Sequence, residues 1–126
     1  MMTDEIWSHI HSYKASGEKA KQSFEVPGGT LELVFTMSTV RALFRPPASP
    51  YPDESAWREA AEALLREHQL KDDYRDDSYV FSTQEGMYLG RLRPEEFLFT
   101  PERFEDKDEL LAAIVALYAP STDGKR

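Results

Sequence analysis

Residues 23–35, which read SFEVPGGTLELVF, decide the class of fold. Two short runs rich in apolar residues flank Pro27-Gly28-Gly29, and glycine readily adopts the positive φ angles that a tight turn requires. This stretch therefore predicts a β-hairpin. A third strand is expected from about Thr39 to Arg45, where apolar residues recur with imperfect alternation.

A second hairpin is predicted further along the chain. Residues 79–82 (YVFS) and 87–92 (MYLGRL) are apolar and aromatic, and the intervening TQEG is typical of a turn. The segment Phe97-Leu98-Phe99 lies between two prolines and is expected to be a short strand rather than an apolar loop. Residues 71–77 (KDDYRDD) have no apolar periodicity, so a solvated loop is expected there.

Three helices complete the prediction. The first spans 3–16, with Thr3 as its cap and Gly17 as its stop, and the second spans 54–69 after a connector with four prolines, capped by Asp53 or Ser55. Asp106 followed by Glu109 predicts the start of the last helix, which Pro120 ends. The expected order is α-β-β-β-α-β-β-(β)-α, an α+β fold with one antiparallel sheet built from two hairpin units. Residues 1–120 are expected to form a single domain and residues 121–126 a disordered tail.

Composition narrows the possible functions. The 126 residues include no cysteine, which excludes disulfides and cysteine metal sites. The net charge is −8, and residues 51–126 carry all of it because residues 1–50 contain five acids and five bases. No run of Lys and Arg suggests direct nucleic-acid binding. An acidic N-terminus and the lack of a long apolar run predict a cytoplasmic protein that does not engage a membrane.

The sequence carries no standard catalytic signature, neither a phosphate-binding loop nor a nucleophile elbow nor a zinc-protease motif. His9 and His11 are two residues apart, so on a helix they point in different directions and are not expected to share a metal. His68 near Asp72 and Asp73 is a candidate acid or base, although a histidine at a helix end is the more ordinary interpretation. No catalytic residue, metal or cofactor is predicted.

Two features point to a protein partner, and the residues that we expect to contact it are Asp72, Asp73, Tyr74, Asp76, Asp77, Tyr79, Phe97 and Phe99. The first feature is the acidic segment 72–77 with its bordering tyrosines, because tyrosine is enriched at interfaces. The second is the apolar stretch 110–119, which the phenylalanines 97, 99 and 104 precede. This helix must be covered on more than one side, by the domain itself, by a second protomer or by a client protein.

The element order resembles that of the class I type III secretion chaperones, a fold shared by the YbjN-like proteins. The local similarities are residues 63–68 (ALLREH), residues 85–90 (EGMYLG) and the Asp-rich start of the last helix. The resemblance implies a homodimer that holds an extended client segment on its sheet and in apolar grooves, without catalysis. The alternative hypothesis is an acidic antagonist, such as a toxin-immunity or phage counter-defence protein, whose segment 72–77 blocks a basic site of its partner.

Overall fold

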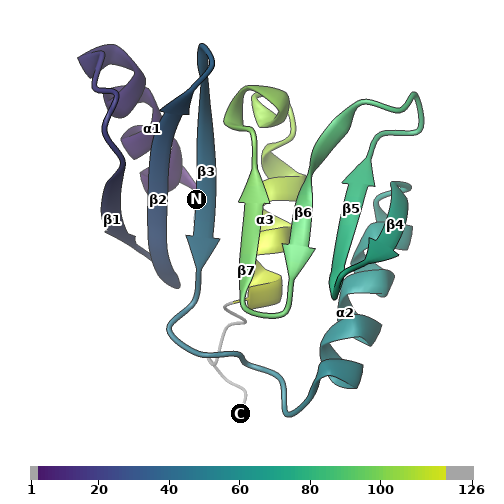
Figure 1. The fold of residues 1–126 in the computed structure, drawn as a ribbon. Helices are drawn as coiled ribbons and strands as arrows, with labels where there is room; N and C mark the ends of the chain where they lie inside the picture. The colour runs from purple at the N-terminus through teal and green to yellow at the C-terminus, as the bar shows by residue number, and fades with distance from the viewer. Residues whose placement is uncertain (1–2, 119–126) are drawn as a thin grey trace.

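The computed structural model describes residues 3–118. Three α-helices, one short 3₁₀ helix and seven strands follow one another along this part of the chain (Figure 1). Their bounds are α1 Asp4–Ser16, β1 Gln22–Val26, β2 Gly29–Thr36, β3 Thr39–Arg45, α2 Glu54–Glu67, β4 Lys71–Arg75, β5 Ser78–Ser82, β6 Tyr88–Arg93, β7 Glu96–Phe99, η1 Pro101–Phe104 and α3 Asp108–Tyr118. The predicted disordered tail, residues 121–126, lies outside the described residues.

The seven strands form one antiparallel sheet in the order β1-β2-β3-β7-β6-β5-β4. All three helices pack on the same face of the sheet, and the opposite face has no helix over it (Figure 1). The prediction of an α+β fold with a single antiparallel sheet is confirmed. So is the strand at 97–99, since β7 pairs with β3 and thereby joins the two hairpin units.

The strand order of the sheet is approximately symmetric about the β3–β7 pair. A helix followed by a three-stranded meander occurs twice, as α1-β1-β2-β3 and as α2 with β5-β6-β7. The last strands of the two meanders pair antiparallel, so the strand order outward from that pair is the same in both halves. The additional strand β4 and helix α3 distinguish the second half from the first.

The prediction of a loop at 71–77 is wrong, because residues Lys71–Arg75 form β4 at the edge of the sheet. Asp76 and Asp77 are the two central residues of the β4–β5 turn, and both have positive φ angles, 53° and 60°. Aspartate tolerates this conformation, which is that of a type I′ hairpin turn. Only Tyr74 of this edge strand is even partly buried, so β4 needs no apolar alternation. Charged residues also protect such an edge from pairing with other chains. Hydrophobic periodicity therefore does not reveal β4.

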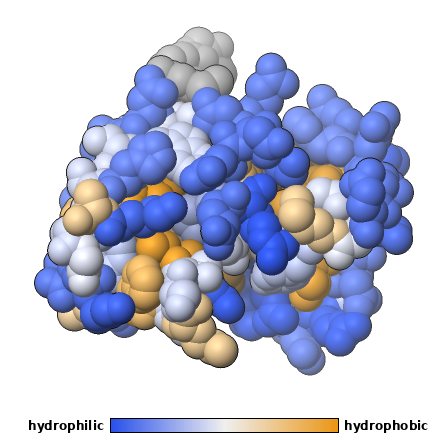
Figure 2. Space-filling view, turned by 90° about the horizontal axis from the view of Figure 1, so that it is seen from above, coloured by the Kyte–Doolittle hydropathy of each residue, from blue (hydrophilic) through white to orange (hydrophobic). Residues whose placement is uncertain are grey.

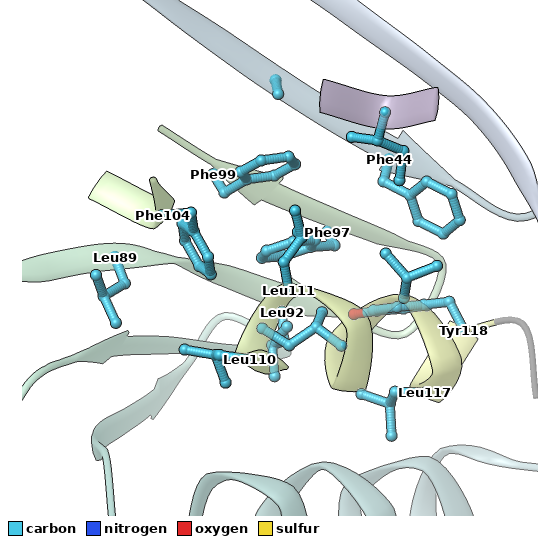
Figure 3. Packing of buried hydrophobic residues seen from close by; sticks show 14 of the residues in the cluster. Phe44, Leu89, Leu92, Phe97, Phe99, Phe104, Leu110, Leu111, Leu117 and Tyr118 are labelled. Atoms are coloured by element: carbon cyan, nitrogen blue, oxygen red, sulfur yellow. The ribbon is translucent and has the colours of Figure 1, made fainter. Parts of the chain in front are cut away.

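The core lies between the sheet and its helices. Strand register aligns one buried side chain from each of five neighbouring strands in a row across the sheet, namely Leu31, Phe44, Phe97, Leu92 and Tyr79. The rings of Phe97, Phe99 and Phe104 contact one another beneath α3 (Figure 3). Gly90 lies among these rings, and a Cβ there would come within 2.5 Å of the Leu98 carbonyl oxygen.

The helix ends match the caps predicted from the sequence only in part. Gly17 ends α1 with a φ of 73°, and Asp53 caps α2 by accepting a hydrogen bond from the amide of Ala56. Thr3 is at the capping position of α1, but its hydroxyl donates instead to Asp108, 105 residues away. Helix α3 begins at Asp108 and not at Asp106, because Asp106 lies in the turn that precedes the helix.

None of the helices within residues 3–118 has the length and apolar character needed to cross a bilayer.

Candidate protein-binding site

The candidate site is the sheet face that no helix covers, which we call the open face. Because side chains alternate along each strand, the residues opposite the helices can be assigned from the register. The charged and apolar ones are the carboxylates Glu25, Glu32, Asp73 and Glu96, the bases Arg41, Arg45, Lys71, Arg75, Arg91 and Arg93, the aliphatic residues Val34, Leu43, Val80 and Leu98, and the exposed Tyr88 at the start of β6.

A row of aligned residues crosses the middle of the open face. From β2 to β4 the register places Glu32, Leu43, Leu98, Arg91, Val80 and Asp73 side by side on successive strands. The two leucines are neighbours and are each partly exposed, although they lie on strands in the middle of the sheet. The centre of the open face is therefore apolar and its ends are charged.

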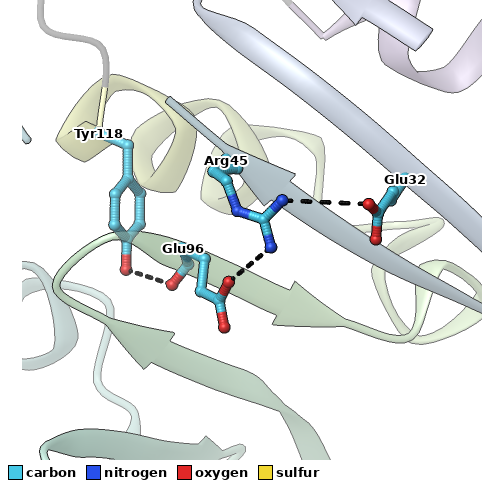
Figure 4. Close-up of polar contacts among 4 residues, drawn as sticks. All are labelled: Glu32, Arg45, Glu96 and Tyr118. Atoms are coloured by element: carbon cyan, nitrogen blue, oxygen red, sulfur yellow. Dashed lines mark hydrogen bonds and ion pairs between the residues drawn. The ribbon is translucent and has the colours of Figure 1, made fainter. Parts of the chain in front are cut away.

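The carboxylates of the open face neutralise some of its arginines and leave others unpaired. Arg45 lies 3.0 Å from a carboxylate oxygen of Glu96 and 3.9 Å from one of Glu32, so it bridges strands β2 and β7 (Figure 4). Arg41 and Arg91, in contrast, have no ion-pair partner among residues 3–118. Two guanidinium groups beside the central leucines are thus free to bind carboxylates of another molecule.

The open face differs in charge from the rest of the molecule. Its six bases and four acids give it a net charge of +2, whereas the whole chain has −8. The excess of acid lies on helices, turns and the edge formed by α2 and β4. Residues 53–77 alone contain nine acids and four bases.

A second surface, the acidic hairpin, consists of β4, its turn and β5. Asp72, Asp73, Asp76 and Asp77 are all exposed, as a solvated or partner-binding segment requires. Asp73 forms an ion pair with Arg75, and the other three have no ion-pair partner within the described residues. Aspartates in a type I′ turn are held in fixed positions relative to the sheet, so this hairpin is a preorganised acidic surface.

Tyrosines fix the acidic hairpin to α2. The guanidinium carbon of Arg58 lies 4.0 Å from the ring centroid of Tyr74, and the Tyr74 hydroxyl donates a 2.8 Å hydrogen bond to Glu54. The hydrogen bond to Glu54 stabilises the neutral phenol and raises the pKa of Tyr74 to about 12. The Tyr79 hydroxyl donates to Glu62 and accepts a 3.1 Å hydrogen bond from Arg58. Burial is the main cause that raises the pKa of Tyr79.

Several residues predicted to contact a partner are instead in the core. Tyr79, Phe97 and Phe99 are 1%, 0% and 3% exposed, so none of them presents a surface to another protein. The apolar helix α3 is likewise covered by the sheet, α2 and η1, as its buried residues Leu110, Leu111, Ile114, Val115, Leu117 and Tyr118 show. Its hydrophobicity is explained by burial within the chain and does not indicate a client.

His68, the candidate acid or base, follows the last turn of α2 and lines a groove of about 630 Å³. The groove is shared with the β5–β6 turn and the start of α3, and neither Asp72 nor Asp73 lines it. Figure 2 looks onto this end of the molecule, where hydrophilic side chains separate small apolar areas. Met37 and Met87, which are 88% and 38% exposed, lie in the turns at this end. The groove therefore places His68 with the carboxylates of Glu105, Asp106 and Glu109, and not with those of Asp72 and Asp73 that the sequence suggested for acid-base chemistry.

Comparison of the chain with protein-family models, with curated proteins and with solved structures found no match. The similarity to secretion chaperones therefore stays a prediction that rests on element order. Sequence reasoning missed the arginines of the open face, because they are distant in sequence and become neighbours only through strand register. One signal was available, since Arg41, Arg45 and Arg91 occur among apolar residues within two predicted strands.

Proposed function

We propose that this chain is a non-catalytic protein-binding domain that holds a segment of another protein on its open face. The observation that carries the proposal is the pair Leu43 and Leu98, which lie partly exposed in the centre of a sheet face without a helical layer. Apolar side chains in such a position lose contact with water when a partner binds. The proposal agrees with the sheet-borne client binding that the resemblance to secretion chaperones implies.

A selection experiment tests this function without a known partner. A random dodecapeptide library displayed on phage is selected against the wild-type chain, and the recovered peptides are then titrated against Leu43→Thr/Leu98→Thr. Threonine is β-branched, which strands favour, but it removes most of the apolar surface. Since burying the exposed part of each leucine contributes up to about 1 kcal/mol, we expect the double variant to bind about tenfold more weakly.

The matched control is Met87→Thr, which removes an exposed apolar side chain from the β5–β6 turn, away from the open face. It should leave peptide affinity unchanged. Circular dichroism melting curves establish that each variant is folded. Peptides that bind the wild type and the leucine variant equally would contradict the proposed function.

A second candidate function, the acidic antagonist, is favoured by one observation, the four exposed aspartates on a rigid hairpin. Its test replaces Asp72, Asp73, Asp76 and Asp77 together by asparagine, which also tolerates the positive φ of the turn. The control replaces Glu59, Glu67, Glu85 and Glu102 by glutamine and changes the net charge equally. An antagonist requires that association with a basic target slow markedly in the first variant and much less in the second.

A further inference from the structure

We infer that the segment held on the open face is an extended, acidic one in which two carboxylates flank an apolar residue. The inference rests on the proposed function and adds the chemistry of the partner. It is derived from the positions of Arg41, Arg91 and the two central leucines.

The first step is the sign of the charge. In a chain of net charge −8, the open face carries +2, and three of its arginines, Arg41, Arg91 and Arg93, lack a carboxylate partner among the described residues. Arg41 and Arg91 are the two that lie nearest to the central leucines. A basic partner would be repelled by those arginines, whereas an acidic segment supplies carboxylates that pair with them. Acidic side chains are repelled elsewhere on this protein, so its charge distribution steers them toward the open face.

The second step is the spacing. Arg91 is aligned with Leu98 and Leu43, and Arg41 lies two residues from Leu43 along β3. With strands about 4.8 Å apart and about 3.3 Å per residue, the Cα atoms of Arg41 and Arg91 are separated by roughly 12 Å. Residues i and i+4 of an extended segment are about 13 Å apart and point to the same side. A carboxylate at each of these positions reaches one arginine, and residue i+2 falls over Leu98.

The third step decides between a protein segment and a nucleic acid. Single-stranded nucleic acids bind to sheets through aromatic side chains on which bases stack, combined with a uniformly basic groove. The open face has one exposed aromatic side chain, Tyr88 at the start of β6, and none in the row that crosses its centre, so it offers no series of stacking rings. Four carboxylates also lie among its bases. This combination suits alternating acidic and apolar side chains and not a chain of phosphates.

Chemical-shift titration of the ¹⁵N-labelled chain tests the inference with defined probes. The probes are the peptide SGETLTEGS, its neutral counterpart SGQTLTQGS, its basic counterpart SGKTLTKGS and a short oligothymidylate. The acidic peptide should shift amides of β3, β7 and β6 and bind about five to ten times more tightly than the neutral one, because each exposed ion pair contributes up to about 1 kcal/mol. The basic peptide should bind most weakly.

Two variants locate the effect. Arg41→Gln/Arg91→Gln should bind the acidic and the neutral peptide alike. Lys19→Gln/Arg66→Gln removes two exposed charges away from the open face, because Lys19 lies over the ring of Phe35 on the helix side of β2 and Arg66 is on α2. This variant should retain the preference for the acidic peptide. The lysine and arginine of this control, like Arg41 and Arg91, form no ion pair within the described residues.

The outcomes separate this inference from the function on which it rests. Equal binding of the acidic and neutral peptides, shifts outside the open face, or no shifts would overturn the acidic motif. So would tighter binding of the oligothymidylate at the same strands. The proposed function is judged independently by the peptides from the phage selection, which can depend on Leu43 and Leu98 without containing the acidic pattern.

Discussion

Replacing Asp108 by alanine should weaken the attachment of α1 to α3, because one carboxylate oxygen of Asp108, in the first turn of α3, accepts hydrogen bonds from two residues at the start of α1. The Thr3 hydroxyl donates to it at 3.0 Å and the Trp7 indole nitrogen at 2.8 Å. Thr3 is completely buried, so its hydroxyl has no access to water when the carboxylate is removed. The substitution leaves two donors without an acceptor.

The magnitude follows from these contacts. Hydrogen bonds to a charged group contribute about 1.5 to 3 kcal/mol each, and a carboxylate in the first turn of a helix adds up to about 1 kcal/mol. Trp7 and Asp108 are only partly buried, which lowers the sum. We therefore expect Asp108→Ala to reduce the free energy of unfolding by about 3 kcal/mol, equivalent to a decrease in Tm of about 10 °C for a domain of this size.

Urea unfolding followed by circular dichroism measures the loss, and two further variants identify its cause. Asp108→Asn keeps an oxygen acceptor and should lose about half as much. In a double-mutant cycle, Asp108→Ala and Trp7→Phe should show a coupling of about 1 to 2 kcal/mol. A loss below about 0.5 kcal/mol for Asp108→Ala, or no coupling with Trp7, would refute the assigned role.

Three other predictions concern the strands and their turns. Met37 and Ser38 have φ angles of 50° and 73° in a two-residue turn, so Met37→Asn/Ser38→Gly should raise stability by about 1 kcal/mol in thermal melts. Gly90→Ala should lower stability in urea by about 2 to 4 kcal/mol, because its Cβ would lie 2.5 Å from a backbone oxygen; an unchanged midpoint would exclude that close approach. The pKa of Tyr74 is raised to about 12 in the folded chain, so its stabilising contribution is complete below pH 10 and is lost as the pH rises from 10 toward 12. Absorbance at about 295 nm should show one tyrosine fewer ionising above pH 11 in Glu54→Gln, and no change would contradict the Tyr74–Glu54 hydrogen bond.

The sequence predicts those parts of the fold whose local pattern agrees with their final environment. The hairpin around Pro27-Gly28 and the amphipathic α2 are examples, since one face of each is buried and the other is in water. Strand β4 was missed because four of its five residues are charged and its conformation depends on pairing with β5. The intrinsic strand propensity of these residues does not reflect the stabilisation that β5 provides by pairing with them.

The candidate site was less predictable than the fold for a related reason. A basic cluster can be recognised in a sequence only when its residues are close together along the chain. Arg41 and Arg91 are 50 positions apart and are brought onto one face by the register of β3, β7 and β6. The aromatic residues were easy to find in the sequence, but their role was ambiguous. Phe97 and Phe99 suit an interface and a core equally well, and only the position of β7 beneath η1 and α3 decides for the core.

The two candidate functions use surfaces of opposite charge, and this determines which measurements discriminate between them. Added salt weakens both an acidic segment on the open face and a basic target on the acidic hairpin, so salt dependence alone does not separate the two. The sign of the partner's charge does separate the two functions. Removing Arg41 and Arg91 should weaken an acidic partner and, by making the chain more negative, speed the association of a basic one, whereas removing the four aspartates should have the reverse effects. A partner tested against both variants is therefore assigned to one surface by the direction of two changes.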